Sequence, residues 1–356
     1  MKSVAVIGGG VNGVMVAWEV AKKGNRVSLF EQKKLFSETS SATSKLIHGG
    51  IRYLEHGHFS LVHQALQDRA WWLKNASDFV FPTRFFLPIY KGRSRSKLML
   101  YAGVKGYQYL AFKNSLGPSL WHTPKAILKM APELEETGLQ GAVSYFDAQM
   151  NDVGLGCWLK SQILASGVTI REDTPISRFD ANGNLFLEEG CQMNFDVIIN
   201  AAGPWVKRLL DASNLKCAHD LELIRGSHLI VDRKINSSFV LQNSEDGRII
   251  FALPIGNRML LGTTEISHSL EEANQCSLRE EKYLLDVINV NFRRKILSSD
   301  IVEKYSGVRP LFKSAVKKSA LSREAFIEKE NKLINIFGGK WTTSPSLAIS
   351  VANLII

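Results

Sequence analysis

The start of the chain alternates between strand-like and helix-like patterns of apolar positions. Residues 4–7 form an uninterrupted apolar run, which is typical of a parallel strand buried on both faces. Apolar residues then follow with helical spacing from position 14 to position 21, and Gly24 stands where a helix commonly ends. Residues 26–30 predict a second strand. The order strand, helix, strand predicts a βαβ unit.

Similar patterns recur later in the chain, and a different kind of sheet separates them. Residues 152–165 have a helical pattern, and residues 195–200 and 332–337 have the composition of buried strands. Three further runs predict strands of an antiparallel sheet: residues 221–231, 248–254 and 259–264. The sequence therefore predicts an α/β fold in which one domain is built from the start, middle and end of the chain, with an antiparallel sheet inserted.

A glycine pattern follows the first predicted strand. Gly8, Gly10 and Gly13 fit the spacing G-x-G-x-x-G, and Glu31 ends the second strand 18 residues after Gly13. In dinucleotide-binding folds these glycines let a pyrophosphate approach a helix N-terminus, and the acid binds the adenosine ribose. Because glycines, strands, helix and acid are all in register, the segment predicts dinucleotide binding.

Residues 40–55 lie one βαβ step after this pattern and combine hydroxyls, glycines and basic residues. Their hydroxyl groups suit a pyrophosphate or a ribityl chain. Gly49 and Gly50 follow His48 and lack a Cβ, so the backbone could come within contact distance of a flat ring. Arg52 and Tyr53 offer a fixed charge and a hydroxyl to an anion beside that ring. The alternative is a polar surface loop with turn glycines.

Composition narrows the classes of partner and site. The net charge of +10 indicates an anionic partner: a phosphorylated substrate, an acidic lipid or, ranked last because no recognised module is present, nucleic acid. The four cysteines are far apart and form no C-x-x-C pair, so we expect no zinc ribbon and predict no metal site. No uncharged apolar stretch reaches the roughly 18 residues needed to span a bilayer.

Part of the positive charge lies within residues 91–113, where a basic run at residues 91–97 leads into an apolar and aromatic stretch with two further lysines. Such a stretch could lie in an anionic membrane surface. The alternative is a solvated helix face packed on the core, and this second interpretation is the default.

These segments together resemble one family. The resemblance spans nearly the whole chain and is carried by motifs in family order: residues 8–13, 40–55, 200–207, 225–230, 262–264, 305–311, 321–323 and 337–343. Residues 45–55 and 305–311 are quite specific to it. The chain resembles the FAD-dependent glycerol-3-phosphate dehydrogenases of the aerobic, respiratory type.

The resemblance implies a glycine-oxidase-like fold that binds FAD noncovalently. It implies a discontinuous FAD-binding domain of residues 1–75, 140–215 and 305–356, and a substrate or cap domain of residues 76–139 and 216–304. The implied reaction is oxidation of sn-glycerol 3-phosphate to dihydroxyacetone phosphate by hydride transfer from C2 to FAD N5. Electrons would pass to quinone, and the protein would be cytoplasmic or peripheral on the cytoplasmic face of the inner membrane.

The resemblance also assigns site residues. FAD would be bound by residues of five segments: Gly8, Gly10, Gly13, Glu31, Ser40, Ser41, Ser44, Lys45, Leu46, His48, Gly49, Gly203, Gly339, Lys340 and Trp341. The substrate would be surrounded by a mainly basic set: Arg52, Tyr53, His228, Arg309, Arg323, Lys340 and Thr342.

Three of these residues are assigned to catalysis. Arg309, with Arg323, would bind the phosphate dianion through planar guanidinium groups. His228 would accept the alcohol proton, and its pKa would be lowered by the surrounding cations. Lys340, in a glycine turn before a helix, would add positive potential beside the flavin ring. The competing interpretations are a hydrogen-bonded core histidine, surface ion pairs for the arginines and a solvated lysine.

The chain departs from the family pattern at two places. The family continues into a C-terminal helical domain, whereas this chain stops at Ile356, 13 residues after Thr343. Ser344 and Pro345 stand where the family usually has tyrosine and arginine, which removes one positive charge. Two alternatives stay open: an FAD-dependent enzyme that acts on another hydroxy acid or amine, and a non-catalytic flavoprotein.

Overall fold

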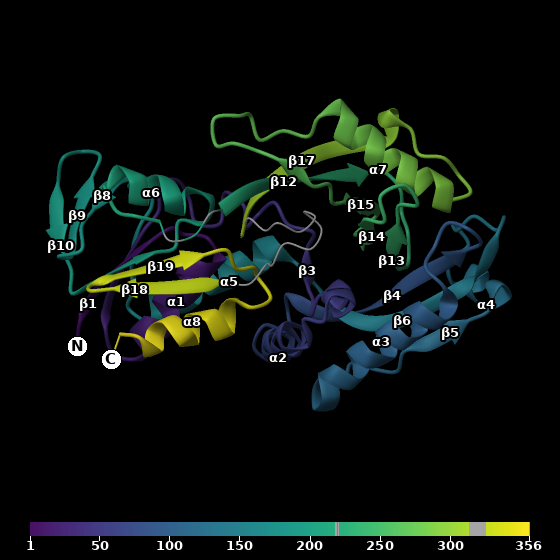
Figure 1. The fold of residues 1–356 in the computed structure, drawn as a ribbon, viewed down its shortest axis with the longest axis horizontal. Coiled ribbons are helices and arrows are strands. Elements are labelled where there is room, and N and C mark those ends of the chain that lie inside the picture. Colours follow the sequence, from purple (N-terminus) through teal and green to yellow (C-terminus); the bar gives the residue numbers. More distant parts are fainter. Residues whose placement is uncertain (218, 220, 313–324, 356) are drawn as a thin grey trace.

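Two sheets form the framework of the protein. The computed structural model describes residues 1–217, 219, 221–312 and 325–355. Figure 1 shows the smaller sheet on the left, together with both chain ends, and the larger sheet on the right.

The smaller sheet contains strands from the start, middle and end of the chain. Its order is β18 (Phe326–Glu330), β19 (Leu333–Phe337), β11 (Val197–Asn200), β1 (Ser3–Ile7), β2 (Arg26–Phe30) and β7 (Thr169–Arg171). The neighbours are parallel except for the edge strand β18, which is antiparallel to β19. Parallel neighbours need crossovers, which explains why the strands are distant in sequence.

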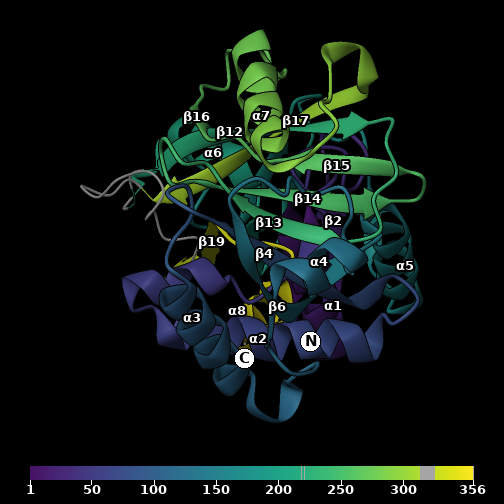
Figure 2. The same cartoon turned by 90° about the vertical axis from the view of Figure 1, so that its right-hand side faces the viewer.

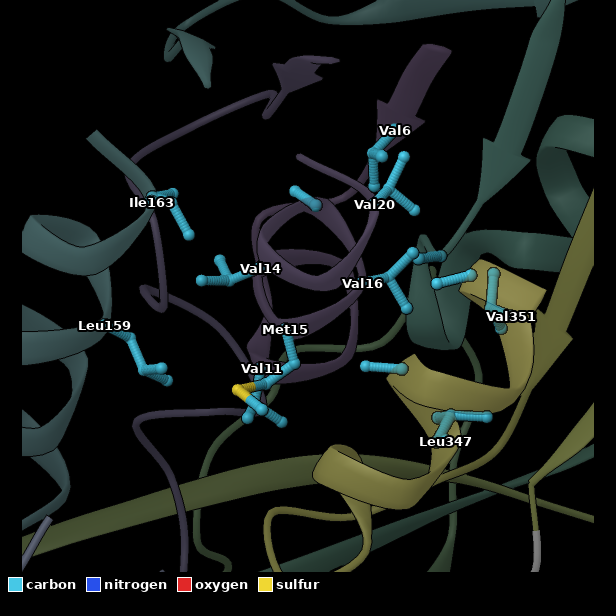
Figure 3. Packing of buried hydrophobic residues seen from close by; sticks show 14 of the residues in the cluster. Val6, Val11, Val14, Met15, Val16, Val20, Leu159, Ile163, Leu347 and Val351 are labelled. Carbon is cyan, nitrogen blue, oxygen red and sulfur yellow. The ribbon is translucent and has the colours of Figure 1, made fainter. Parts of the chain in front are cut away.

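Helices cover both faces of this sheet. Val4 and Val6 of β1 join one apolar cluster and Ala5 and Ile7 join another, as the alternation of side chains along a strand requires. Helices α1 (Val11–Lys22), α5 (Asp152–Ala165) and α8 (Ser344–Asn353) pack in the first cluster, and Figure 3 shows α1 between the other two. The opposite cluster contains α6 (Val206–Ala212) and a small sheet of β8 (Ile176–Phe179), β9 (Asn184–Leu187) and β10 (Gln192–Asn194).

The larger sheet is mostly antiparallel. Its order is β16 (Ile266–Ser267), β12 (Leu221–Val231), β15 (Arg258–Gly262), β14 (Ile249–Ile255), β13 (Ser238–Gln242), β4 (Val80–Tyr90), β6 (Leu139–Met150) and β3 (Leu46–Ile47). In addition, β17 (Ile301–Phe312) pairs with β12 and β5 (Leu120–His122) pairs with β6.

Helices also cover this sheet on both faces. Helices α4 (Pro124–Met130) and α7 (Leu278–Asn291) share one apolar cluster with it, and α2 (Phe59–Asn75) and α3 (Lys97–Ala111) share another. Figure 2 shows α7 on one side of the strands and α2 and α3 on the other. Four short 3₁₀ helices complete the described elements: η1 (Ile51–His56), η2 (Phe112–Asn114), η3 (Gly203–Trp205) and η4 (Ser298–Asp300).

Strand pairing bears on how the chain divides. Residues 139–150 (β6) and 301–312 (β17) belong to the larger sheet. The division expected from the sequence places residues 140–215 and 305–356 with the cofactor-binding part. We therefore propose that the chain divides in the same interleaved way, except that β6 and β17 belong to the substrate or cap part, which carries the larger sheet.

Candidate active site

A cavity of about 590 Å³ lies where the two sheets meet. Ile7 and Phe30, the last residues of β1 and β2, line it, and so does Ala201, which follows β11. Open α/β sheets bind ligands at this edge, outside the carboxyl ends of their parallel strands. Strands β12 and β17 of the larger sheet line the cavity as well.

The glycine pattern shapes one end of the cavity. Gly8 and Gly10 line it, whereas Gly13 supports the loop from behind, because a Cβ there would lie 1.9 Å from the Gly8 carbonyl oxygen. Helix α1 begins after Gly10 with no side-chain cap and no acidic residue in its first turn. The Val11 amide donates to Ser40 Oγ at 3.0 Å. The positive end of α1 therefore faces a space that suits a pyrophosphate.

Glu31 lines the cavity and also holds the glycine loop. Its side chain is buried, and Oε2 accepts a hydrogen bond from the Gly9 amide at 2.6 Å. Oε1 accepts from the Lys33 amide at 2.9 Å. The carboxylate thus ties the loop after β1 to the end of β2, next to the position expected for an adenosine ribose.

The segment after β2 brings only some of its predicted residues to the cavity. Ser40, Ser44, Leu46 and His48 line it. Ser41 and Lys45 are not among its lining residues: Ser41 Oγ donates to the Glu38 carbonyl at 2.8 Å, and Lys45 Nζ pairs with the buried carboxylate of Asp152 at 2.5 Å. Lys45 therefore anchors this segment to the start of α5.

Positions 49 and 50 require glycine because a Cβ at either of them would collide with a neighbouring side chain of the protein. A Cβ on Gly49 would lie 2.5 Å from the Tyr107 hydroxyl oxygen and 2.8 Å from Leu66 Cδ2. The Gly49 amide donates to that hydroxyl at 2.8 Å. Gly50 has φ +75°, and a Cβ there would strike the Tyr53 ring. Gly49 is not a lining residue, so its lack of a side chain is explained by helices α2 and α3.

The turn after β19 closes the cavity beside the glycine loop. Asn12 Nδ2 donates to the Gly338 carbonyl at 3.0 Å, and Gly339 has φ +89°. Trp341 Nε1 donates to the Ser40 carbonyl at 2.9 Å. The Thr342 hydroxyl accepts from the His48 amide at 3.1 Å. Residues 339–342 all line the cavity, so the turn joins its chain segments.

His228 lies on β12 with almost no exposed surface. Its Nε2 is 2.8 Å from Ser44 Oγ, and its ring stacks on Tyr305 of β17 with centroids 4.8 Å apart. Burial, followed by the charges of Arg309 and Lys45, lowers the pKa of His228 to about 3. The imidazole is therefore neutral at physiological pH.

Arg309 shares a strand face with His228. In the β12–β17 pair, His228 faces Tyr305 and Gly226 faces Gly307, so these residues and Arg309 project to the same side. A Cβ on Gly226 would lie 2.5 Å from Arg309 Nη2, so the glycine makes room for the guanidinium group. Nη2 donates to the Thr264 carbonyl at 2.9 Å.

The remaining predicted substrate residues differ in placement. Lys340 lines the cavity, and its Nζ lies 5.3 Å from the centre of the Tyr53 ring. Tyr53 and Arg52 belong to the 3₁₀ helix η1 and are not lining residues. Gly203, predicted to contact the cofactor, does line the cavity. Arg323 lies outside the described residues.

The cavity lining includes many residues that were not predicted as site residues, and three of them lie beside predicted ones. Asn12 lies inside the glycine pattern, Gly226 interrupts a strand, and Thr263 follows β15. A glycine within a strand often marks a close approach of another group, and that signal was available for Gly226. Thr263 lies in the motif of residues 262–264, but nothing in its sequence position indicates that its hydroxyl lies near Gly226 and Arg309.

The lining residues fit FAD on their own chemistry. The N-terminus of α1, where Gly10 provides no side-chain cap, suits the pyrophosphate. The hydroxyls of Ser40 and Ser44 suit a polyol chain, and the volume is in the usual range for ligand pockets. Among the described residues, no group of three or more histidine, cysteine, aspartate or glutamate side chains could hold a metal ion.

Comparison with known proteins agrees with this fit. Residues 3–354 match the family described as FAD dependent oxidoreductase. Glycerol-3-phosphate dehydrogenase of Pseudomonas aeruginosa is 36% identical over 98% of this chain, which spans 70% of that protein. D-erythritol 1-phosphate dehydrogenase of Brucella abortus is 32% identical over 96% of this chain and 71% of that protein.

Solved structures show the same fold. Glycerol-3-phosphate dehydrogenase from Bacillus halodurans, complexed with FAD, matches with a TM-score of 0.78 and 23% identity, covering 100% of this chain and 64% of that one. Glycine oxidase from Bacillus cereus gives a TM-score of 0.78 at 19% identity, covering 100% of this chain and 95% of that one. The predicted fold class and cofactor are confirmed. The chain belongs to the FAD-dependent oxidoreductase family and groups there with the glycerol-3-phosphate dehydrogenases.

Proposed function

We propose that this chain oxidises sn-glycerol 3-phosphate to dihydroxyacetone phosphate, with FAD as its cofactor. One observation carries the proposal: His228 and Arg309 project from the same face of two paired strands into the cavity that the glycine loop also lines. A neutral imidazole and a guanidinium group at one site suit an alcohol that carries a phosphate.

Arg309 is the proposed phosphate ligand. Its Nη2 is fixed by the Thr264 carbonyl, and Gly226 leaves the space in which the guanidinium group lies. A guanidinium group can donate two parallel hydrogen bonds to a phosphate, which orients the substrate as well as binding it. Arg323 remains in the proposal as a second phosphate ligand, on the resemblance alone.

His228 and Ser44 are the proposed path for the alcohol proton. Nδ1 of His228 is buried and has no hydrogen-bond partner among the described residues, whereas Nε2 contacts the Ser44 hydroxyl. Ser44 lines the cavity and can accept the proton of the substrate hydroxyl while donating its own to Nε2. The low pKa keeps the imidazole neutral, so Nε2 has a free lone pair for that proton, and the negative charge of a bound phosphate would raise this pKa and make the imidazole a stronger base.

FAD, when bound, supplies the acceptor for the hydride that leaves C2 of the substrate. Lys340 lines the cavity just before α8, whose first turn contains no acidic residue. The lysine and the helix N-terminus add positive potential on that side of the cavity, which favours negative charge there.

Quinone is the proposed electron acceptor, and an anionic membrane surface is the proposed location. None of the helices in the described part of the chain is both long enough and apolar enough to cross a bilayer. The support for a surface location comes from α3, whose exposed side carries apolar, aromatic and basic residues.

The test is anaerobic mixing of the FAD-loaded protein with glycerol 3-phosphate while the flavin absorbance is followed. Bleaching by glycerol 3-phosphate is expected, and Arg309→Ala should lower kcat/KM by about 100-fold or more, since a charged hydrogen bond to the substrate is lost. Equal bleaching by unphosphorylated glycerol would contradict the proposal. If none of the tested substrates bleaches the flavin, the result would favour a non-catalytic flavoprotein.

A second candidate is oxidation of a longer polyol phosphate. The D-erythritol 1-phosphate dehydrogenase at 32% identity supports it, because that relative matches this chain over nearly the same span as the glycerol-3-phosphate dehydrogenases. The same assay with erythritol phosphate decides between the two. The substrate with the higher kcat/KM is the better assignment.

A further inference from the structure

A buried carboxylate lies behind the proposed phosphate site. Glu280, in the first turn of α7, is almost fully buried and accepts hydrogen bonds from two other chain segments. Its Oε1 accepts from Ser227 Oγ and from Thr264 Oγ1, each at 2.7 Å. Its Oε2 pairs with Arg225 at 2.7 Å and accepts from the Ser277 amide at 3.0 Å.

This carboxylate is ionised under all ordinary conditions. Five hydrogen bonds satisfy its two oxygens, and the amides at the start of α7 lie beside it. Although burial acts in the opposite direction, these hydrogen bonds lower the pKa of Glu280 to about 2. A permanently charged, fully hydrogen-bonded carboxylate is a rigid anchor for the groups that donate to it.

Both anchored segments lead directly to the proposed substrate residues. Thr264 donates its hydroxyl to Glu280, and its carbonyl oxygen accepts the bond from Arg309 Nη2 at 2.9 Å. Ser227 precedes His228 on β12, and its amide donates to Thr264 Oγ1 at 2.9 Å. Ser227 Oγ also contacts Ser306 Oγ of β17 at 2.7 Å. Glu280 thus ties β12, β17 and the segment after β15 together behind Arg309.

We propose that Glu280 is a positioning residue that fixes the Arg309 guanidinium group for the phosphate of the substrate, acting through Thr264. The inference rests on the proposed function, in which Arg309 binds that phosphate. Without the carboxylate, Thr264 loses the acceptor of its hydroxyl, and its carbonyl is no longer fixed. Arg309 then samples orientations that do not fit a phosphate, and phosphate binding weakens.

The test measures phosphate binding and turnover separately. Isothermal titration of the FAD-loaded protein with inorganic phosphate should give a Kd about tenfold higher for Glu280→Ala than for the wild type. The KM for glycerol 3-phosphate should rise by a similar factor while kcat stays within about threefold, because the lost contact serves binding. The matched control is Glu281→Ala, which removes the neighbouring buried carboxylate that pairs with Lys304 of β17.

A second pair of variants tests the path and guards against simple misfolding. Thr264→Val removes the hydroxyl but keeps the shape, and it should raise the phosphate Kd as Glu280→Ala does, whereas Thr264→Ser should not. The double variant Glu280→Ala/Thr264→Val should bind phosphate no more weakly than Glu280→Ala alone, because both substitutions remove the same hydrogen bond between Thr264 and Glu280. If the two substitutions together raised the phosphate Kd by the product of their separate factors, the proposed path would be contradicted.

The outcomes separate this inference from the proposed function. A wild type that binds phosphate but does not oxidise glycerol 3-phosphate would refute the proposed function only, and the phosphate titration would still decide the role of Glu280. If Glu280→Ala lowers the melting temperature but leaves the phosphate Kd unchanged, Glu280 is merely structural and the inference is wrong. A wild type that binds no phosphate would overturn it as well.

Discussion

At the scale of single residues, burial sets the charge of His228. Its ordinary pKa near 6.5 falls to about 3 in the folded protein. As pH drops below 6.5, the unfolded chain binds a proton that the folded protein does not bind. The folded state therefore loses stability from pH 6.5 downward, by about 1.4 kcal/mol per pH unit, until the pH approaches 3.

Replacement of His228 tests this pH dependence. Between pH 7 and pH 5, the free energy of unfolding of the wild type should fall by about 2 kcal/mol more than that of His228→Gln, which cannot titrate. Urea denaturation at the two pH values, at one free FAD concentration, measures both slopes. Any uniform destabilisation by the glutamine cancels in the comparison. Parallel pH profiles would mean that His228 keeps an ordinary pKa.

Glycines show how far single residues could be interpreted from the sequence. The pattern of Gly8, Gly10 and Gly13 could be recognised because its spacing reflects a local backbone geometry; Gly8 and Gly10 line the cavity, whereas Gly13 packs behind the loop. Gly49 was predicted to approach the flavin, yet the structure explains it by contacts with Tyr107 and Leu66. Those contacts come from helices that follow later in the sequence, and no local pattern reports them.

At the scale of elements, α3 has two unlike sides. Its buried residues, Val104, Tyr107 and Ala111, face the larger sheet. Leu98, Lys105 and Tyr109 lie about two and three turns apart on the opposite side, where Leu98 is 79% and Tyr109 is 80% exposed. An apolar and basic stripe of this kind suits an anionic membrane surface. Of the basic residues before the helix, Arg95 is engaged with Glu55.

Vesicle binding tests this side of α3. Replacing Leu98 and Tyr109 together with glutamate should weaken binding to anionic vesicles by about tenfold or more, because apolar area is lost and negative charge is added. Co-sedimentation with vesicles containing phosphatidylserine measures it. Leu278→Glu is the matched control, because Leu278 on α7 is also 80% exposed but belongs to another surface. Equal binding by both variants and the wild type would identify α3 as ordinary surface.

Elements could be predicted where the periodicity was clear. The predicted helix of residues 152–165 and strand of residues 221–231 have the bounds of α5 and β12. The long pair β4–β6 was not predicted, because most residues of β6 are buried on both faces and its sequence lacks an alternating pattern. Residues 52 and 53 fall in a 3₁₀ helix that no periodicity indicates; they do not line the cavity themselves, although the Tyr53 ring lies beside the lining residue Lys340.

At the scale of the whole molecule, the cavity joins segments that are distant in the sequence. It is lined by the start of the chain, the segment after β2, strands β12 and β17, and the turn before α8. The interleaved order was predicted because buried parallel strands need crossovers, whereas the pairing of β12 with β17 across some 80 residues has no local signature. A cofactor in this cavity contacts parts of both sheets, so FAD binding should stabilise the molecule as one unit.

Gly10 offers a way to test that coupling without disturbing the fold. Its backbone, with φ −72°, is open to any residue, and a Cβ there would meet only Ser40 Oγ at 3.2 Å within the protein. The added methyl group would occupy the space at the N-terminus of α1 where the pyrophosphate is proposed to bind. Gly13→Ala could not serve, because its Cβ would collide with the Gly8 carbonyl.

We expect Gly10→Ala to fold like the wild type and to lose at least half of its stabilisation by FAD. At a free FAD concentration of about 100 times Kd, the wild type gains about 2.7 kcal/mol, which raises its melting temperature by several degrees in a single transition. A Kd raised tenfold or more by the methyl group would halve that gain or reduce it further. Differential scanning calorimetry with and without FAD measures it. Gly103→Ala, at an uncrowded position within α3, is the control and should keep the full FAD-induced shift. If Gly10→Ala kept that shift too, the pyrophosphate would have to bind elsewhere than at the start of α1.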